Sequence, residues 1–214
     1  MSYRSIIFDL DGTLIDQFSA IHRAFSQVIV DMGYDRPTFD TVKKAIGGAS
    51  ESTMAKLIGP DRAKEAVEKL RPIFEKVMFE GLVALPYANE SLFRLKQNDY
   101  KIAVLTNKYG PHARKTCDYL GLSEYLEFTL GAEDTNWKKP NILLTEFALC
   151  KLGSSAAETV YIGDSPYDFE TAKNADTECL LVDTGTHSFE ELSSLNKGCV
   201  FKDLRAVTDY ILES

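Results

Sequence analysis

The chain has few of the residues that build zinc sites or disulfide frameworks. Among its 214 residues are only four cysteines and three histidines, and no two cysteines have the Cys-x-x-Cys spacing. This scarcity argues against both kinds of site and indicates reduced, mostly buried thiols, so we expect a cytoplasmic protein. The cysteines are Cys117, Cys150, Cys179 and Cys199, and the histidines, which share no metal-ligand spacing, are His22, His112 and His187.

Long apolar runs and an excess of positive charge are also missing. No segment approaches the length of a membrane-spanning helix, and the N-terminus lacks the basic-then-apolar layout of a signal peptide. The 24 basic and 32 acidic residues give a net charge of −8, which argues against binding to nucleic acid or to an acidic membrane. We therefore expect no nucleic-acid partner and no membrane partner.

Short apolar runs alternate with helical patterns over much of the chain. This alternation predicts an α/β fold with a mainly parallel sheet covered on both faces. The predicted strands are 6–8, 101–105, 128–130, 159–162 and 179–182, and helical patterns fall at 111–120, 142–152 and 166–174.

The region 17–85 has a different pattern and contains no convincing strand. Its apolar residues follow helical spacing from Ile21 to Met32 and again from Ala63 to Met78. Pro72 is expected to kink or split the second of these helices. We interpret 17–85 as an all-helical insertion, with 1–16 and 86–214 together forming the α/β core.

Two aspartates end the first predicted strand. The apolar run Ile6–Phe8 leads into Asp9 and Asp11, and Gly12 then breaks the strand. Acids gathered at the rim of a sheet usually accompany a cation or a reaction. Taken alone, the motif is better explained by two turn-forming aspartates, because so short a motif often occurs by chance.

Three more polar clusters follow later strands. They are Thr106-Asn107-Lys108, Lys138-Lys139-Pro140 and the segment from Gly163 to Asp168. Each alone could be a helix cap or a turn. Open α/β sheets bind ligands beyond the carboxyl ends of their strands, so the four clusters in this order predict one shared site.

Together these motifs resemble those of the haloacid dehalogenase superfamily, specifically its phosphatases of the phosphoglycolate phosphatase type. The first family motif matches Asp9-Leu10-Asp11-Gly12-Thr13, and the second matches Thr106. The Lys-Pro motif matches Lys139-Pro140, with Lys138 as the weaker candidate, and the acidic motif matches Gly163, Asp164 and Asp168. The resemblance spans essentially the whole chain and implies a Rossmann-like core with a helical cap domain at 17–85.

The resemblance also implies a catalytic role for three residues. Asp9 would attack phosphorus, Asp11 would carry the proton to and from the leaving group and water, and Lys139 would reduce the charge repulsion. Mg²⁺ is the implied cofactor, since it takes hard oxygen ligands. Its ligands would be Asp9, Asp164 and the main-chain carbonyl of Asp11.

Four further residues receive supporting roles from the same resemblance. Thr106, Asn107 and Lys108 would bind the substrate, with the Thr106 hydroxyl and amide groups near Asn107 holding the phosphoryl oxygens. Asp168 would support the metal shell rather than bind the ion directly.

The implied function is a Mg-dependent phosphatase that hydrolyses a small phosphomonoester through an aspartyl-phosphate intermediate. A pyrophosphatase, a nucleotide phosphatase and a sugar phosphomutase are alternatives, as is a non-enzymatic module that binds a phospholigand. The acid at Asp11 favours phosphoryl transfer over dehalogenation, and no Arg follows Gly47-Gly48 as a phosphomutase would require. A closing helical cap favours a small, anionic substrate. The oligomeric state stays open between a monomer and a homodimer.

Overall fold

The computed structural model describes residues 3–213. Two compact units make up the chain: one comprises Met1–Asp16 and Ala84–Ser214, and the other comprises Gln17–Val83. No helix in the described part of the chain is both long and apolar enough to cross a bilayer.

The first unit is built on a six-stranded sheet with the order β5-β4-β1-β6-β7-β8. All of its described strand pairs are parallel, which confirms the predicted sheet. The strands are β1 (Ser5–Phe8), β4 (Lys101–Tyr109), β5 (Phe128–Ala132), β6 (Thr159–Gly163), β7 (Glu178–Val182) and β8 (Val200–Phe201). The two-residue β8 is too short to leave a periodic pattern, and it was not predicted.

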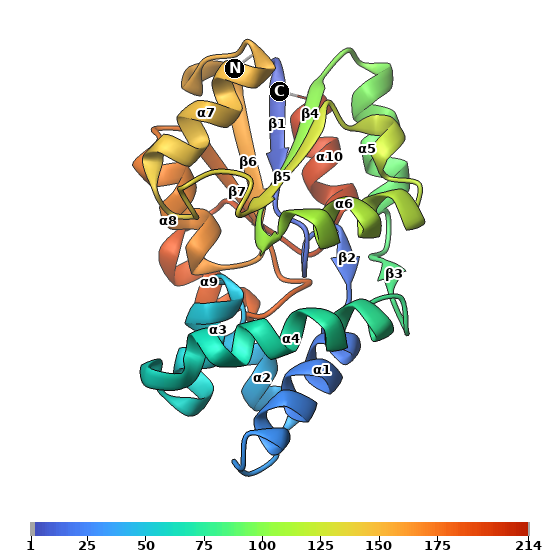
Figure 1. Cartoon of the computed structure of the whole chain (residues 1–214). Helices are drawn as coiled ribbons and strands as arrows, with labels where there is room; N and C mark the ends of the chain where they lie inside the picture. The colour runs from blue at the N-terminus through green and yellow to red at the C-terminus, as the bar shows by residue number, and fades with distance from the viewer. Residues whose placement is uncertain (1–2, 214) are drawn as a thin grey trace. The chain divides into compact units, whose positions relative to one another are not determined.

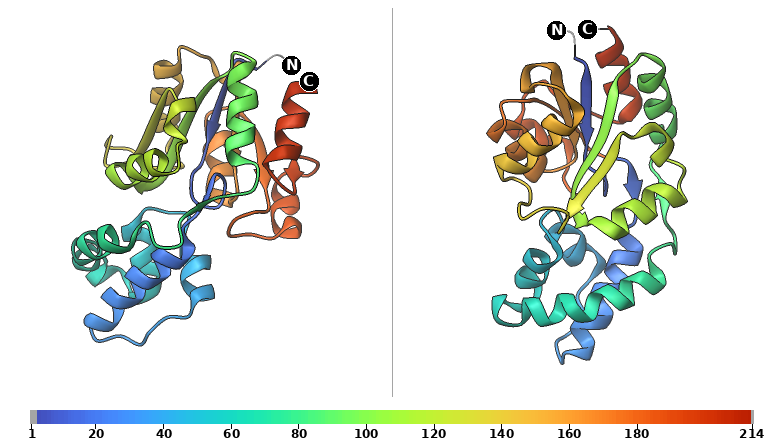
Figure 2. Two further views of the ribbon diagram at one scale, coloured as in Figure 1. Left: turned by 90° about the vertical axis from the view of Figure 1, so that its right-hand side faces the viewer. Right: turned by 45° about the horizontal axis from the view of Figure 1, so that its top comes forward.

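Helices cover both faces of this sheet. On one face α5 (Ala88–Gln97) and α10 (Leu204–Glu213) lie side by side, and on the other lie α7 (Ile142–Leu152) and α8 (Pro166–Asn174) (Figures 1 and 2). The remaining helices of the unit are α6 (Gly110–Tyr119) and α9 (Phe189–Leu195), with 3-10 turns at Ser123–Tyr125 and Ala156–Glu158.

Successive residues of the central strands point to opposite faces and are all buried. Ile7, Ala103 and Tyr161 belong to the core cluster that also contains residues of α7 and α8, while their neighbours Ile6 and Phe8 are equally inaccessible. A parallel sheet covered on both faces has no solvent-facing side. This explains why its strands are continuous apolar runs in the sequence.

The end of β4 departs from the predicted strand. β4 continues to Tyr109, four residues beyond the predicted end at Leu105, but its pairing with β5 shifts register between these two residues. Thr106, Asn107 and Lys108 therefore lie in the irregular end of the strand rather than after it. Such an irregularity bends a strand and changes the direction of its side chains, and those of Asn107 and Lys108 bond to other loops here.

The second unit is helical. Its helices are α1 (Phe18–Asp31), α2 (Phe39–Ala45), α3 (Ser50–Ile58) and α4 (Ala63–Val77), with a 3-10 turn at Pro60–Arg62. They enclose their own apolar core, in which α1 and α4 pack together. The assignment of this unit as a cap stays a prediction.

One local expectation for 17–85 was wrong, and another was settled only in part. Pro72 does not split the helix, because α4 runs unbroken from Ala63 to Val77; the alternative, a kink at Pro72, stays a prediction. A proline removes one helical hydrogen bond, whereas buried Leu70 and Phe74 on either side of it anchor α4 in the core. The region also contains one strand, β3 (Val83–Ala84). It forms a two-stranded sheet with β2 (Ile15–Asp16), which precedes the region.

Candidate active site

Asp9 stands at the carboxyl end of the central strand β1. Its backbone N–H donates to Ile162 O at 2.9 Å, which extends the β1–β6 ladder by one residue. The apolar strand ends at this position, and Asp9 as a whole residue is 8% exposed. A turn follows, in which Leu14 N donates to Leu10 O at 2.9 Å and Gly12 adopts φ +89°. The strand and turn predicted from the sequence thus deliver two acids to the sheet edge.

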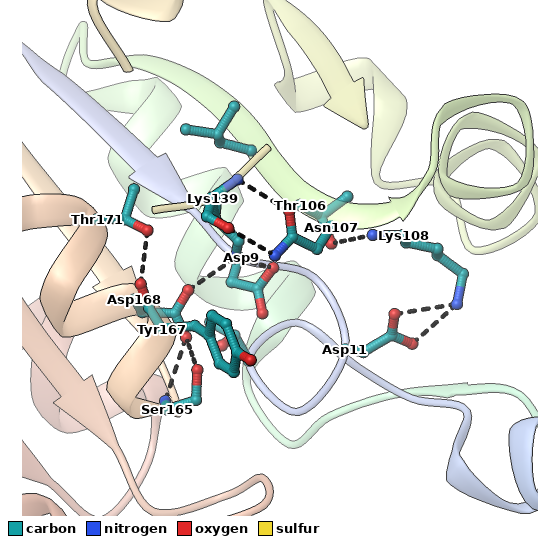
Figure 3. Close-up of polar contacts among 12 residues, drawn as sticks. Asp9, Asp11, Thr106, Asn107, Lys108, Lys139, Ser165, Tyr167, Asp168 and Thr171 are labelled. Atoms are coloured by element: carbon teal, nitrogen blue, oxygen red, sulfur yellow. Dashed lines mark hydrogen bonds and ion pairs between the residues drawn. The ribbon is translucent and has the colours of Figure 1, made fainter. Parts of the chain in front are cut away.

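Lys139 lies buried between two carboxylates. Its Nζ is 2.8 Å from Asp9 Oδ1 and 2.7 Å from Asp168 Oδ1 (Figure 3). The backbone of Lys139 is held by Asn107, whose Oδ1 accepts from Lys139 N at 2.9 Å and whose Nδ2 donates to Lys139 O at 3.2 Å. The irregular end of β4 therefore fixes the loop that carries the lysine.

Asp168 is fully committed to hydrogen bonds within the protein. Its Oδ2 accepts from the backbone N–H groups of Asp164 and Ser165 at 3.2 and 3.1 Å, and from Ser165 Oγ at 2.6 Å. Its Oδ1 accepts from Lys139 and from the hydroxyl of Tyr161 at 3.3 Å. These bonds tie the start of α8 to the lysine and leave Asp168 little capacity to bind an ion.

Asp164 is oriented by the loop that follows β7. Its Oδ2 accepts from the backbone N–H of Thr186 at 2.8 Å and from the Thr186 hydroxyl at 3.0 Å. Its Oδ1 accepts a long bond of 3.4 Å from the hydroxyl of Thr13. A Cβ at Gly185 would collide with Asp164 Oδ2, so the loop reaches the carboxylate only because that position is glycine.

Asp11 forms a separate pair with Lys108. Lys108 Nζ lies 3.0 Å from both carboxylate oxygens of Asp11. The lysine also orders the end of β4, where its backbone N–H donates to Thr106 Oγ1 at 3.3 Å. Each acid of the first motif therefore has its own lysine, Lys139 for Asp9 and Lys108 for Asp11.

Burial disfavours the charged forms of the carboxylates in this site. It raises the pKa of Asp9 to about 6, with Lys139 opposing the shift and Asp168 adding to it. Burial and the neighbouring carboxylates of Asp168 and Asp9 raise the pKa of Asp164 to about 8. Burial alone would lower the pKa of Lys139, but Asp168 and Asp9 outweigh it and hold that pKa well above its usual value.

The acidic cluster fits a divalent cation. Ligand oxygens of Asp9, Asp164 and Asp168 lie within 4.8 Å of one another, and all three residues are buried. Lys139 is the one cation that pairs with them among the described ion pairs, so the cluster carries an excess of negative charge. An all-oxygen donor set with surplus charge suits a hard metal ion. The raised pKa values of Asp9 and Asp164 have the same origin, since burial and the neighbouring carboxylates act on both residues.

The structure brings the predicted site residues to one edge of the sheet. Figure 3 shows residues from the first loop, the end of β4, the Lys139 segment and the start of α8 around the same centre. Lys138, the weaker lysine candidate, is exposed. The side-chain amide of Asn107 bonds to the backbone of Lys139, so it holds the Lys139 loop in place rather than facing a substrate.

Sequence reasoning missed two residues of the site. Thr186 follows the predicted strand 179–182 by four residues, and a search for a fifth polar cluster after that strand could have found it. Tyr161 is inside a predicted strand and looks like a core residue. Its hydroxyl lies 3.1 Å from Leu105 O and 3.3 Å from Asp168 Oδ1, so the two acceptors share its one proton. Burial raises the pKa of Tyr161 well above its usual value, which keeps that proton in place.

Comparisons with known proteins agree with this architecture. The sequence model of the haloacid dehalogenase-like hydrolases matches residues 6–182. A phosphoglycolate phosphatase of Yersinia pestis is 28% identical over 211 residues, covering 94% of this chain and 91% of the relative. Another phosphoglycolate phosphatase, from Aquifex aeolicus, is 32% identical over 185 residues, covering 83% and 84%.

Solved structures have the same fold. A haloacid dehalogenase-like family hydrolase from Streptococcus pneumoniae superposes with a TM-score of 0.88 at 22% identity, covering 97% of this chain and 98% of that one. The parallel sheet with its acidic edge and the matching sequences define a hydrolase whose catalytic unit is a parallel sheet covered by helices. The chain belongs to the haloacid dehalogenase-like hydrolases. Within that family it is a phosphatase.

Proposed function

We propose that this phosphatase hydrolyses a small phosphomonoester through an aspartyl-phosphate formed on Asp9, with Mg²⁺ as the cofactor. The position of Asp9 carries the proposal. Asp9 is buried at the end of β1, its carboxylate lies 2.8 Å from Lys139 Nζ, and it belongs to the Asp9–Asp164–Asp168 cluster. The names of the relatives support a substrate of the phosphoglycolate type.

Asp9, Asp164 and the main-chain carbonyl of Asp11 are the proposed ligands of the ion. The bound ion supplies Lewis-acid stabilisation of phosphoryl oxygen charge. Asp168 supports this shell through its bonds to the backbone of Asp164 and to Lys139, in keeping with its saturated hydrogen bonding.

The protein's side chains divide the chemistry between them. A carboxylate oxygen of Asp9 attacks phosphorus, the bond from phosphorus to the leaving oxygen breaks, and Asp11 donates a proton to that oxygen. Water then attacks the phosphorus of the aspartyl-phosphate and gives its proton to Asp11, and the bond from phosphorus to Asp9 breaks. Lys139 reduces the repulsion between Asp9 and the phosphate dianion.

The end of β4 is the proposed phosphoryl-binding segment. The Thr106 hydroxyl and backbone amide groups near Asn107 would hold phosphoryl oxygens, with Lys108 as the third substrate-binding residue. The Asn107 side chain supports this segment indirectly, because it fixes the Lys139 backbone. We also propose a cytoplasmic location, for which the few scattered cysteines are the basis. The choice between a monomer and a homodimer stays open.

The deciding experiment is hydrolysis of an aryl phosphate with and without Mg²⁺, comparing the wild type with Asp9→Asn. We expect Mg-dependent turnover that Asp9→Asn lowers by about a thousandfold or more, as losses of catalytic nucleophiles do. Rapid quenching should trap protein-bound phosphate that hydroxylamine releases from the wild type and not from the variant. A wild type as slow as Asp9→Asn on every phosphate tried would mean a binding module instead.

The substrate is identified by a hydrolysis panel of phosphoglycolate, pyrophosphate, sugar phosphates and nucleotides. We expect the highest kcat/KM for a small anionic monoester. Faster turnover of pyrophosphate or of a nucleotide would assign the chain to one of those activities. Conversion of one sugar phosphate into its isomer, with no release of phosphate, would assign a phosphomutase.

A further inference from the structure

The loop between β7 and α9 connects a histidine to Asp164. Its Thr186 donates to Asp164 Oδ2 through the backbone N–H, at 2.8 Å, and through the hydroxyl, at 3.0 Å. On its other side the same hydroxyl oxygen lies 2.9 Å from His187 Nδ1. The three residues therefore form a chain of polar contacts from an imidazole ring to the carboxylate, with the threonine hydroxyl in the middle.

Hydrogen bonds fasten this loop at both ends. At its start the hydroxyl of Thr184 donates to Gly12 O at 2.7 Å. At its end Ser188 and Glu191 form a capping box, in which Ser188 N donates to Glu191 Oε2 at 2.8 Å and Glu191 N donates to Ser188 Oγ at 3.3 Å. The half-buried His187 directly precedes that cap. The loop backbone thus holds the imidazole in place between two anchored ends.

The Thr186 hydroxyl has one proton and two polar neighbours. An ionised carboxylate accepts hydrogen bonds and donates none, and a charged acceptor forms the stronger bond. The proton of Thr186 therefore points to Asp164 when Asp164 is ionised, as a metal ligand must be. An unprotonated Nδ1 of His187 would then set its lone pair against the hydroxyl oxygen. The 2.9 Å contact requires a proton on Nδ1 instead.

We propose that His187 is a positioning residue for Asp164, and that it acts through Thr186. Its Nδ1–H donates to Thr186 Oγ1, so the hydroxyl is kept directed at Asp164 Oδ2. Hydrogen bonds in such a chain polarise and strengthen one another. The inference rests on the role proposed above for Asp164 as a ligand of Mg²⁺. It extends the support of that ligand from one neighbouring group to two.

The first test measures the binding of Mg²⁺ to the substrate-free protein by isothermal titration calorimetry. His187→Phe keeps an aromatic ring and removes the donor, so the Kd for Mg²⁺ should rise about two- to tenfold, the range for the loss of one hydrogen bond. His187→Asn offers an amide N–H near the position of Nδ1 and should stay within about twofold of the wild type.

His22→Phe is the matched control. The His22 ring belongs to the helical unit and its Nε2 lies 3.2 Å from Pro37 O, so the substitution removes a histidine of comparable bonding from another loop. The Kd for Mg²⁺ should not change. Thermal unfolding of each variant checks that it is folded.

A double variant separates an effect through Thr186 from a general loosening of the loop. Thr186→Val removes the hydroxyl through which His187 is proposed to act. Adding His187→Phe to this variant should therefore raise the Kd for Mg²⁺ no further, although each substitution alone raises it. Effects that multiply would show that His187 influences the site by another route, and would overturn the inference.

The position of the proton is tested on the wild type itself, which needs no stable His187→Phe. Long-range proton–nitrogen NMR correlations of the Mg²⁺-loaded protein distinguish a protonated ring nitrogen from an unprotonated one, and the signals that His187→Asn lacks identify the ring. We expect a proton on Nδ1, because the hydrogen bond to Thr186 selects that form. An unprotonated Nδ1 would overturn the inference.

Two further outcomes separate this inference from the proposed function. A His187→Phe variant that binds Mg²⁺ as tightly as the wild type would overturn the inference and leave Asp164 as a ligand. A wild type that binds no Mg²⁺ would overturn the proposed cofactor, and the role of His187 with it.

Discussion

A Cβ placed on Gly12 would lie 2.7 Å from Asp164 Oδ2, although the two residues are 152 positions apart in the sequence. Gly12 follows Asp11 in the turn after β1 and adopts φ +89°, a conformation that side chains rarely tolerate. The close approach lets the turn and the β6–α8 loop share one centre. Glycine therefore serves both backbone conformation and contact here.

Gly12→Ala should disturb both the backbone conformation of the turn and its close approach to Asp164. We expect a loss of unfolding free energy of about 1–3 kcal/mol from backbone strain, together with a loss of phosphatase activity as Asp164 is displaced. Gly33→Ala is the control, because Gly33 has φ +87° with no atom within 4 Å of its added Cβ. Chemical denaturation should show a cost in both variants, and activity assays a loss in Gly12→Ala alone. Equal activity in the two would contradict the role given to this contact.

Thr186→Val should weaken the response to magnesium. The substitution removes the hydroxyl that donates to Asp164 Oδ2 and keeps the backbone N–H bond to the same oxygen. Groups that orient metal ligands contribute about 10- to 100-fold in affinity or activity, so the Mg²⁺ concentration at half-maximal activity should rise about tenfold. Thr186→Ser keeps the hydroxyl and should titrate like the wild type. A Val variant with unchanged magnesium dependence would show that Asp164 needs no such orientation.

Lys139→Met should destabilise the metal-free protein. Lys139 is buried between Asp9 and Asp168, and removing one partner of a buried ion pair costs about 3–5 kcal/mol at neutral pH. Urea unfolding measures this loss. Lys138→Met removes the same charge at an exposed position and should change stability by no more than about 0.5 kcal/mol. Similar unfolding curves for the two variants would mean that Lys139 contributes to catalysis without stabilising the fold.

Stability without metal should fall as the pH rises. The pKa values of Asp9, about 6, and Asp164, about 8, both exceed the ordinary 3.8. Between about pH 4 and pH 8 the folded state thus holds protons that the unfolded chain has released, and linkage makes the contribution of these groups to the unfolding free energy decline with pH. This stability is complete below the ordinary pKa and is lost by the time the pH has passed the raised ones.

Magnesium should reverse that decline, because it binds the ionised carboxylates. The increase in melting temperature on adding Mg²⁺ should therefore be larger at pH 8 than at pH 5. Scanning calorimetry at both pH values provides the measurement. Asp164→Asn removes the group with the higher pKa, so its metal-free stability should depend less on pH. A magnesium effect of the same size at pH 5 and pH 8 would argue against a site made of these carboxylates.

Local sequence patterns predicted much of the fold and the main features of the site. The apolar run before Asp9 specified a buried strand, because a parallel sheet covered on both faces needs apolar side chains at every position. The glycine after Asp11 specified the turn. The strands ahead of Thr106 and Asp164 placed these residues at the same sheet edge, since parallel strands all end there.

Only the tertiary structure decided which groups bind which. These pairings join loops that are distant in the sequence. Lys139 is shared by Asp9 and Asp168. Thr186 orients Asp164, and Lys108 binds Asp11. No local propensity encodes such a partner, because the choice depends on side-chain reach and on burial after the strands have aligned. Burial also raises the pKa values of Asp9 and Asp164, which the local sequence does not reveal. The sequence determined which chemical groups are present at the sheet edge, and the packing around them determined their charge and their partners.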